Sequence, residues 1–266
     1  MIAFPNAKIN IGLQITGKRN DGYHDLQTVF YPVALKDVLE ITDNTSSFIF
    51  NSSGIVTGAM ENICVKAFHL LEKDFSLPPV QIYLHKTIPV GAGLGGGSAD
   101  AAFCLQLLDK KFNLQLTIKQ LSHYALQLGS DCPFFIINKP CLATGRGEQL
   151  EEISLDLTGY RILLVNPGIH VKTSWAFSKF SRYNRDRELK KNISNPVTDW
   201  KDTIFNDFEG VVFDEHPEIK ELKKEIYHCG AIYASMSGSG SSVFGIFSKN
   251  SQPILNFPDN YFIDWL

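Results

Sequence analysis

Hydrophobic and polar residues alternate near the start of the chain. Within residues 2–15, every second residue from Ile9 to Ile15 is apolar, which is the period of a β-strand with one buried face. Lys8 and Asn10 fall between these apolar positions. We therefore expect an interrupted strand over this segment, with Lys8 and Asn10 on its polar face.

Apolar residues at a spacing of three to four predict helices later in the chain. Thr117 and Gln120 form a capping box at the start of one helix, and Gly129 ends it. Gly230 is expected just beyond the C-terminal end of another. The expected helices cover residues 61–74, the segment after Ser98, residues 118–128 and residues 218–229.

Runs of β-branched and aromatic residues predict strands between these helices. Residues 23–43 are expected to form two strands around Pro32, and the polar residues 44–58 a hairpin. Residues 181–203 are rich in charge, which favours an exposed helix or a mobile segment. The other expected strands cover residues 80–84, 160–165, 231–234 and 242–247.

A shift in composition divides the chain. Residues 140–160 are punctuated by proline and glycine, and a buried strand follows them. A chain of 266 residues is long enough for one large domain or two modest ones. We predict domains at residues 1–150 and 151–266.

Composition narrows the classes of protein to which this chain can belong. Its formal net charge of −3 argues against a nucleic-acid partner, which normally requires a basic excess. The apolar runs are too short to span a bilayer, and no secretory signal is visible. The five cysteines form no C-x-x-C pair, so we expect mostly buried free thiols in a reducing compartment. These observations predict a soluble, cytoplasmic protein without a membrane partner.

The most informative stretch is the glycine-rich segment 89–102. A predicted strand precedes it and a predicted helix follows it, which is the layout of a phosphate cradle at a helix N-terminus. Gly91, Gly93 and Gly96 satisfy the dinucleotide pattern G-x-G-x-x-G, but residues 110–130 lack the acidic residue that this pattern needs. Ser98 follows the last glycine where a P-loop requires lysine. The remaining interpretation is a phosphate site built from backbone N–H groups and the N-terminus of the following helix. The alternative is that the segment is a flexible glycine linker.

A second candidate for chemistry is Asp131, in the sequence Gly-Ser-Asp-Cys-Pro. It is either a simple helix N-cap or the carboxylate that accepts or orients the proton of an acceptor hydroxyl. Lys8 is either an ordinary solvated lysine or the cation that accompanies this carboxylate.

Two further segments are open to a structural and to a functional interpretation. Tyr23 and His24 follow a tight turn, and are either surface residues or a platform for a nucleobase. The serine–glycine run 237–241 is either a hairpin turn or a second backbone nest for an anion.

The chain resembles a known superfamily of kinases. Residues 89–102, with Gly-Leu-Gly-Gly-Gly-Ser-Ala-Asp-Ala-Ala, resemble the ATP loop of the galactokinase, homoserine kinase, mevalonate kinase and phosphomevalonate kinase (GHMP) superfamily. Residues 7–13, 19–28, 129–135 and 236–241 resemble the branch that phosphorylates a cytidine diphosphate alcohol of the non-mevalonate isoprenoid pathway. The resemblance runs from residue 3 to about residue 247.

The resemblance implies an α+β fold and an ATP- and Mg²⁺-dependent reaction. It implies an N-terminal domain like ribosomal protein S5, a ferredoxin-like C-terminal domain, and an active site in the cleft between them. The implied acceptor is the 2-hydroxyl of 4-diphosphocytidyl-2-C-methyl-D-erythritol. The implied catalytic residues are Lys8 and Asp131, and the implied metal ligand is Ser98. The residues implied for ATP are Pro89, Gly91, Gly93, Leu94, Gly95, Gly96, Gly97, Ser98, Asn62 and Lys66. Those implied for the acceptor are Asn10, Tyr23, His24, Thr173, Phe177, Gly238 and Ser239, with Phe177 opposite Tyr23 in an aromatic clamp and His24 on the cytosine.

Two other functions stay open at this point. The first is a kinase or decarboxylase of the same superfamily that acts on mevalonate-type or amino-acid acceptors, and is indifferent to Tyr23 and His24. The second is a nucleotide-binding module without catalysis. For any of them we expect a small-molecule ligand, and a monomer or weak homodimer.

Overall fold

The computed structural model describes residues 1–55, 62–181 and 188–266. The chain forms two compact units, and both contain helices and sheets, as an α+β fold requires. Unit 1 comprises Met1–Lys8, Pro32–Val90 and Gly95–Lys139, and unit 2 comprises Ile9–Tyr31, Gly91–Leu94 and Pro140–Leu266. The division of the chain at residue 150 stays a prediction.

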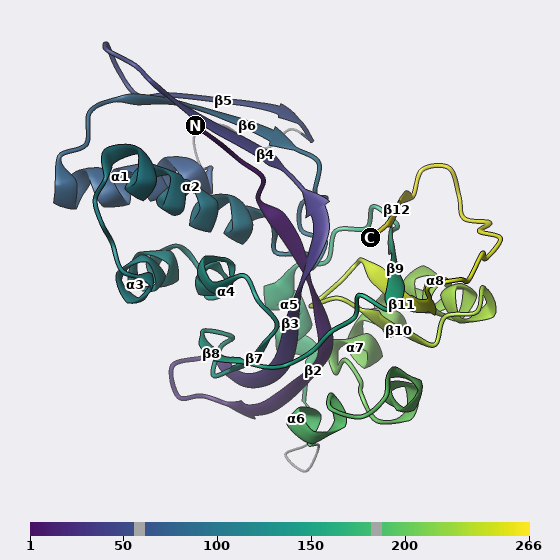
Figure 1. The fold of residues 1–266 in the computed structure, drawn as a ribbon. Coiled ribbons are helices and arrows are strands. Elements are labelled where there is room, and N and C mark those ends of the chain that lie inside the picture. Colours follow the sequence, from purple (N-terminus) through teal and green to yellow (C-terminus); the bar gives the residue numbers. More distant parts are fainter. Residues whose placement is uncertain (56–61, 182–187) are drawn as a thin grey trace. The chain divides into compact units, whose positions relative to one another are not determined.

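Unit 1 contains a four-stranded sheet with helices on one face (Figure 1). The strand order is β1-β4-β6-β5, in which only β5 and β6 run parallel. The buried side chains of β6 recur every second residue and include Lys86 at its end. The strands are β1 (Ile2–Ala3), β4 (Val38–Asp43), β5 (Ile49–Gly54) and β6 (Val80–Lys86). The helices are α1 (Ile63–Phe75), α2 (Gly96–Phe112), α3 (Ile118–Leu128) and α4 (Cys132–Ile137).

Two sheets supply most of the framework of unit 2, although residues 6–8 of the first strand and 32–36 of the second belong to unit 1. The first has the order β2-β3-β7-β8, and the second, β10-β11-β9-β12, is antiparallel throughout. The first comprises β2 (Asn6–Lys18), β3 (His24–Lys36), β7 (Cys141–Thr144) and β8 (Gln149–Glu152). The second comprises β9 (Tyr160–Asn166), β10 (Tyr233–Met236), β11 (Val243–Ser248) and β12 (Phe262–Trp265).

The helices of unit 2 close a hydrophobic core against these strands. Phe208 and Val212 of α7 and Ile219 and Ile226 of α8 are buried with apolar residues of β9, β10 and β11. Their spacing of four and seven puts them on one face of each helix. The helices are α5 (Thr173–Lys179), α6 (Leu189–Asn192), the 3₁₀ helix η2 (Val197–Asp202), α7 (Phe208–Glu215) and α8 (Pro217–His228).

The predicted helix ends are confirmed where their capping signals were specific. The Thr117 hydroxyl accepts from the backbone of Gln120, whose side chain accepts from the backbone of Thr117, so the capping box is present. Gly129 is the C-cap of α3. Gly230, at φ +96°, follows the C-cap of α8, a conformation that favours glycine. Residue 61, the expected start of the first helix, lies outside the described residues.

Several strand predictions were wrong in detail. Strand β2 is buried on both faces, so Lys8 and Asn10 face the interior rather than solvent. Pro32 lies inside β3, and the break comes at Asp37. The ladder with β7 covers Thr28–Phe30 and so does not need an N–H from Pro32. Instead of a hairpin over residues 44–58, β5 pairs in parallel with β6; residues 56–58 lie outside the described part.

The charged segment 181–203 is more ordered and more buried than predicted. Residues 182–187 lie outside the described part of the chain, but α6 and η2 follow them. Leu189, Val197 and Trp200 are buried, and Trp200 is fully enclosed. With Ile193, four buried apolar residues lie at a spacing of three to four, which is a helical period that the many charged residues between them obscured.

All five cysteines are free thiols, as predicted. Four of them are fully buried, and Cys229 at the end of α8 is partly exposed. Among the described residues, no helix combines the length and the apolar character that crossing a bilayer needs.

Candidate active site

The glycine-rich segment forms a loop between β6 and α2 in which the backbone conformation depends on glycine. Gly91, Gly93 and Gly95 have φ values of +66°, +77° and +69°, which side chains disfavour. Gly95 is the N-cap of α2, a helix of 17 residues, and has no side chain to cap it. A Cβ at Gly97 would meet no described atom within 4 Å. The space beside Gly97 is therefore open, and the first N–H groups of a helix, which have no partner within the helix, favour binding of an anion there.

Lys8 and Asp131 lie together beside this loop, within unit 1. The Lys8 Nζ and Asp131 Oδ2 atoms are 3.6 Å apart. A Cβ at Gly95 would come within 3.1 Å of the Lys8 side chain and 3.0 Å of Phe135, so the absence of a side chain at Gly95 makes room for Lys8. Burial lowers the pKa of Lys8, and the charge of Asp131 partly offsets this.

Asp131 occupies the N-cap position of α4, but its carboxylate does not act as a cap. Within the described part of the chain its side chain makes no capping hydrogen bond, and it pairs with Lys8 instead. About a third of the Asp131 side chain (34%) is exposed, against 4% of Lys8. The carboxylate is therefore open to a hydroxyl group from solution, while the lysine is not.

Ser98 and Cys132 connect the starts of α2 and α4. Burial raises the pKa of the Cys132 thiol to about 12, and a hydrogen bond with Ser98 partly opposes this. The hydroxyl proposed to hold a metal thus lies next to the helix that carries Asp131.

A buried group of three charges holds both ends of the glycine loop, and sequence reasoning missed it. Lys86 forms ion pairs with Asp37 and, at 2.7 Å, with Asp100 of α2. Asp37 Oδ1 also accepts from the backbone N–H groups of Thr87 and Ile88, just before the loop. One signal was available in the sequence: Lys86 occupies a position that the alternating pattern of β6 places on the buried face, where a lysine needs a carboxylate partner.

The charge of this group is balanced only when one of its two carboxyl groups is protonated. Two carboxylates share one ammonium group, and Oδ1 of Asp100 is buried without a hydrogen-bond partner among the described residues. Burial, only partly offset by Lys86, raises the pKa of Asp100 to about 8. A Cβ at Gly96 would lie 3.2 Å from Lys86 Nζ, so the ammonium group sits directly behind the loop.

Asn62 and Lys66, expected near the nucleotide, both lie at the start of α1. Asn62 is the N-cap, and its Oδ1 accepts from the backbone of Cys64 at 2.9 Å. This contact gives Asn62 a capping role, whereas Lys66 is exposed. Their role in binding ATP stays a prediction.

In unit 2, Asn10 joins the glycine loop to the serine–glycine turn. The Asn10 backbone N–H donates to Ser237 Oγ at 3.1 Å, and this hydroxyl donates to the carbonyl of Gly93 at 2.8 Å. The Asn10 side chain donates to Thr28 Oγ1 at 2.9 Å. A Cβ at Gly93 would lie 2.0 Å from the Ser237 carbonyl oxygen, so the contact excludes any side chain at Gly93.

The turn between β10 and β11 is held in a nest-like conformation. Gly238 and Gly240 have φ values of +57° and +88°. The hydroxyl groups of Thr173 and Ser239 are 2.8 Å apart, so the structure brings together two of the residues predicted to bind the acceptor.

The aromatic residues differ from the predicted clamp. Phe177 stacks on His24, with ring centroids 4.9 Å apart and an interplanar angle of 15°. Tyr23 is instead 55% exposed and lies under the guanidinium group of Arg146, 4.8 Å from it. A cation attracts the face of a tyrosine ring, which explains why Tyr23 lies there rather than opposite Phe177. Burial, with the charge of Lys18, lowers the pKa of His24, so its ring is neutral near pH 7.

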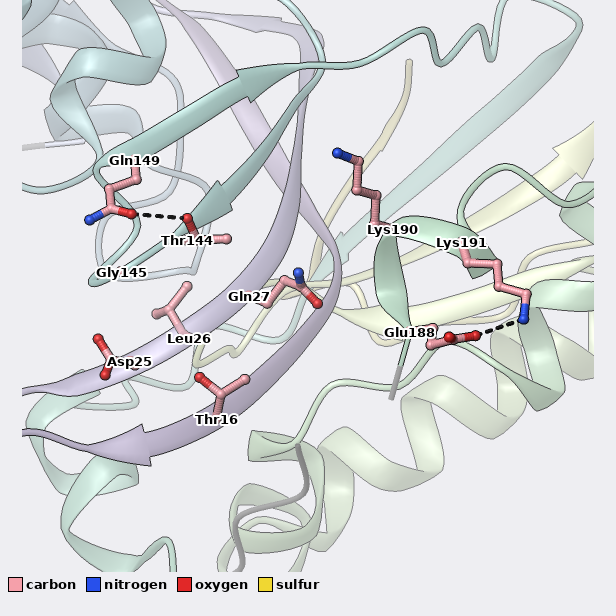
Figure 2. A pocket seen from close by; sticks show the side chains of 10 residues that line it. All are labelled: Thr16, Asp25, Leu26, Gln27, Thr144, Gly145, Gln149, Glu188, Lys190 and Lys191. Atoms are coloured by element: carbon pink, nitrogen blue, oxygen red, sulfur yellow. Dashed lines mark hydrogen bonds and ion pairs between the residues drawn. The ribbon is translucent and has the colours of Figure 1, made fainter. Parts of the chain in front are cut away.

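A cavity of about 730 Å³ opens beside the strand that carries His24 (Figure 2). This volume is typical of a small-molecule site. Lys191 pairs with Glu188 in its wall, and Thr144 with Gln149. The sequence pattern pointed to His24, which directly precedes the lining residues Asp25 and Leu26 in β3, but to none of the residues that line the cavity. It is lined by Thr16, Asp25, Leu26, Gln27, Thr144, Gly145, Gln149, Glu188, Lys190 and Lys191.

Two family models match this chain. Residues 62–139 match the N-terminal domain of the GHMP kinases, and residues 186–256 match the C-terminal domain. The 4-diphosphocytidyl-2-C-methyl-D-erythritol kinase of Bacteroides fragilis is 56% identical over 95% of this chain and 94% of its own length. The kinase of the same name from Bacteroides thetaiotaomicron is 50% identical over 98% of both. This chain belongs to the GHMP kinases, in the family of 4-diphosphocytidyl-2-C-methyl-D-erythritol kinases.

Solved structures agree with this family. A crystal structure of 4-(cytidine 5′-diphospho)-2C-methyl-D-erythritol kinase matches with a TM-score of 0.80 and 32% identity, over 92% of this chain and 90% of that one. The mevalonate kinase of Methanococcus jannaschii shares the fold, with a TM-score of 0.72 over 94% of this chain and 92% of its own, at 13% identity. The protein is thus a small-molecule kinase that uses ATP.

Divalent metals in proteins are often held by clusters of His, Cys, Asp or Glu side chains. Among the described residues, no three His, Cys, Asp or Glu side chains cluster as a metal site. Magnesium commonly takes one or two protein oxygens and completes its shell with phosphates and water. The Ser98 hydroxyl, at the start of α2, fits such a site.

Proposed function

We propose that this GHMP kinase transfers the γ-phosphoryl group of ATP to the 2-hydroxyl of 4-diphosphocytidyl-2-C-methyl-D-erythritol, in the methylerythritol phosphate pathway. The identity of 56% to a relative named for this substrate, over nearly the full length of both chains, carries the proposal. The Lys8–Asp131 pair beside the glycine loop supports it chemically.

In the proposed reaction the Asp131 carboxylate accepts the proton of the acceptor hydroxyl. The hydroxyl oxygen forms a bond to the γ-phosphorus, the bond from that phosphorus to the β-phosphate oxygen breaks, and ADP leaves. Lys8 places a positive charge beside the carboxylate and near the transferring group. The N–H groups of the glycine loop bind the phosphates. Mg²⁺, held by Ser98 and the nucleotide, would neutralise phosphate charge.

For the acceptor we propose binding by two groups of unit 2. Tyr23, His24 and Phe177 take the cytosine, since a neutral imidazole both donates and accepts hydrogen bonds. Asn10, Thr173, Gly238 and Ser239 take the rest of the molecule. The cavity of Figure 2 supports this assignment, because Asp25 and Leu26 in its wall directly follow His24 in β3.

The experiment that tests this function measures ADP formation with a panel of acceptors. We expect turnover with 4-diphosphocytidyl-2-C-methyl-D-erythritol and none above background with mevalonate or homoserine. Turnover with mevalonate or homoserine alone would assign the chain to another branch of the superfamily. ATP binding without ADP release for any acceptor would indicate a module without catalysis.

Further features of the protein are part of the same proposal. We infer the domain boundary near residue 150, a cytoplasmic location, and a monomer or weak homodimer. The free thiols support a reducing compartment. Sedimentation of the purified chain at two concentrations measures the oligomeric state.

A further inference from the structure

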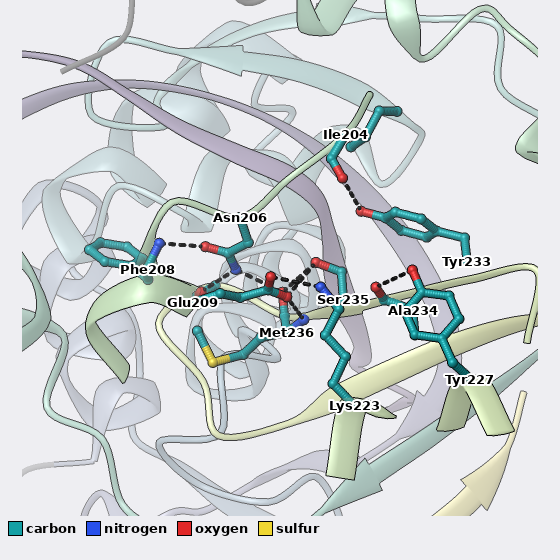
Figure 3. Close-up of polar contacts among 11 residues, drawn as sticks. Ile204, Asn206, Phe208, Glu209, Lys223, Tyr227, Tyr233, Ala234, Ser235 and Met236 are labelled. Atoms are coloured by element: carbon teal, nitrogen blue, oxygen red, sulfur yellow. Dashed lines mark hydrogen bonds and ion pairs between the residues drawn. The ribbon is translucent and has the colours of Figure 1, made fainter. Parts of the chain in front are cut away.

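One buried asparagine, absent from every segment that suggested function, makes direct contacts with the turn between β10 and β11. Asn206 lies between η2 and α7 and is 3% exposed. Its Nδ2 donates to the carbonyl oxygens of Met236 and Gly238, at 2.7 and 2.8 Å. Its Oδ1 accepts from the backbone of Phe208 at 3.0 Å. Figure 3 shows the side chain aimed at the end of β10. Both amide protons and the amide oxygen are therefore in use.

The backbone around Asn206 is fixed to β2. The Leu13 N–H donates to the carbonyl of Phe205 at 2.9 Å, and the Asp207 N–H donates to the carbonyl of Leu13 at 2.8 Å. The Asp207 carboxylate also accepts from the backbone of Ile15. Asn206 thus projects from a short parallel bridge to β2 rather than from a free loop.

The strand that enters the turn is held independently by Glu209. Its Oε1 accepts from the Met236 N–H at 2.9 Å and from Ser235 Oγ at 3.2 Å. Lys223 pairs with its Oε2 at 2.7 Å and balances the charge (Figure 3). Removal of Asn206 therefore leaves the end of β10 anchored, and acts chiefly on the peptide after Gly238.

That peptide determines where one amide proton points. In a planar trans peptide the C=O and the next N–H point in opposite directions. Because Asn206 holds the Gly238 carbonyl, the Ser239 N–H points away from Asn206. The Ser239 hydroxyl forms a hydrogen bond with the Thr173 hydroxyl. The positive φ of Gly238 completes a nest of the kind that binds anions.

We propose that Asn206 is a positioning residue that aims the Ser239 amide at the diphosphate of the acceptor. The inference rests on the proposed function, because it takes the ligand of this turn to be a cytidine diphosphate alcohol. Asn206 does not touch the acceptor itself; it acts through the peptide between Gly238 and Ser239.

The test compares Asn206→Asp and Asn206→Ala with the wild-type enzyme. Both variants lose the two donated hydrogen bonds, and the carboxylate of Asn206→Asp also repels the two carbonyl oxygens. We expect KM for the acceptor to rise about tenfold, equivalent to about 1.4 kcal/mol. KM for ATP and kcat should stay unchanged. Equal changes in all three constants, or no change in folded variants, would overturn the inference.

Asn192→Ala is the matched control. Asn192 Nδ2 also donates to a backbone carbonyl, that of Thr203 at 3.1 Å, in the same unit. This variant should leave all three kinetic constants unchanged. A comparable rise in acceptor KM would mean that general loosening of unit 2, and not the turn, causes the effect, and would refute the role of Asn206.

Two binding measurements separate this inference from the proposed function. Calorimetry with cytidine 5′-diphosphate gives affinity without turnover. If the wild type binds it but phosphorylates no cytidine acceptor, the proposed function fails, while a tenfold weaker affinity in Asn206→Asp would still support Asn206. If neither variant folds, NMR of the wild type decides: cytidine 5′-diphosphate must shift the Ser239 amide resonance, and an unmoved resonance at saturation refutes the inference.

Discussion

At the scale of single residues, the site depends on a contrast between two neighbouring side chains. Lys8 is enclosed, and Asp131 remains one third exposed. The pair therefore has one member fixed by packing and one that an incoming hydroxyl can reach. This contrast gives the two residues different roles, which can be tested separately.

Replacement of Asp131, the proposed base, is expected to affect chemistry and to spare nucleotide binding. Asp131→Asn keeps the shape of the residue and removes the proton acceptor, so kcat should fall about 10²–10⁴-fold. The affinity of the variant for ATP, measured by calorimetry, should equal that of the wild type. Asp156→Asn, at an exposed turn, serves as the control. A kcat near the wild-type value would remove Asp131 from the mechanism.

The pH dependence of the reaction should report on Lys8. Its pKa lies below the ordinary 10.5 because of burial, so rising pH removes its charge earlier than in an exposed lysine. We expect the alkaline fall in kcat to have a midpoint below pH 10.5, and to move to higher pH in Lys8→Arg. An identical midpoint in an active Lys8→Arg variant would assign that fall to another group.

The same shift has a consequence for stability, with the opposite sign. Between the lowered pKa and 10.5, the unfolded chain binds more protons at Lys8 than the folded chain. The contribution of Lys8 to the free energy of unfolding therefore increases as pH rises through this window. Urea titrations of wild type and Lys8→Met at two alkaline pH values can detect the difference.

Sequence reasoning found residues that belong to recognisable local patterns and missed those defined by distant partners. Asp131 follows a glycine at a helix start, and a kinase needs a carboxylate there. Lys86 and Asn206 have no such local pattern, because the acidic partners of Lys86 lie 14 to 49 residues away and the carbonyl groups that Asn206 binds lie 30 to 32 residues away in the chain. Tyr23 was predicted to face Phe177, because nothing in the local sequence indicates that Arg146 lies over its ring.

At the scale of elements, the rigidity of the glycine loop depends on how firmly the residues at its two ends are held. The buried ion pairs of Lys86 tie the end of β6 to α2, and Asp37 anchors the backbone between β6 and the loop. These contacts lie at the two ends of the loop and leave its glycines free for their proposed role in nucleotide binding.

Removal of Lys86 should therefore be costly. Lys86→Met leaves two buried carboxylates without their cation, which typically costs about 3–5 kcal/mol of unfolding free energy. Urea unfolding measures the loss. Lys224→Met breaks an exposed pair with Glu221 on α8 and should cost far less, because solvent screens an exposed ion pair. Similar losses in the two variants would mean that the Lys86 group contributes no more than a surface pair.

Elements were predictable where a local signal determines them. The helices α3 and α8 carry a clear apolar face and a defined end. Strand β5 pairs in parallel with β6, and β12 pairs with β9, so both depend on partners elsewhere in the chain. No turn residue next to either strand indicates this pairing. The 3₁₀ helix η2 is held by two buried residues, Val197 and Trp200, in a charged segment.

At the scale of the whole molecule, stability comes from packing and ion pairs without covalent cross-links. All five cysteines are reduced in the fold. We therefore expect the same thermal midpoint with and without a reducing agent. A lower midpoint in the presence of reductant would show a disulfide that stabilises the protein in solution. Freshly purified and air-aged samples should be compared, since slow oxidation of Cys229 could appear only in the second.

The burial of the thiols also makes the natural sequence convenient for spectroscopy. Cys64, Cys104, Cys132 and Cys141 are fully enclosed, and only Cys229 has partial access to solvent. A maleimide dye should thus attach at one position, at the end of α8, without any engineered cysteine. Since α8 carries none of the proposed catalytic or substrate-binding residues, such a conjugate can report on ligand binding by fluorescence while the enzyme stays active.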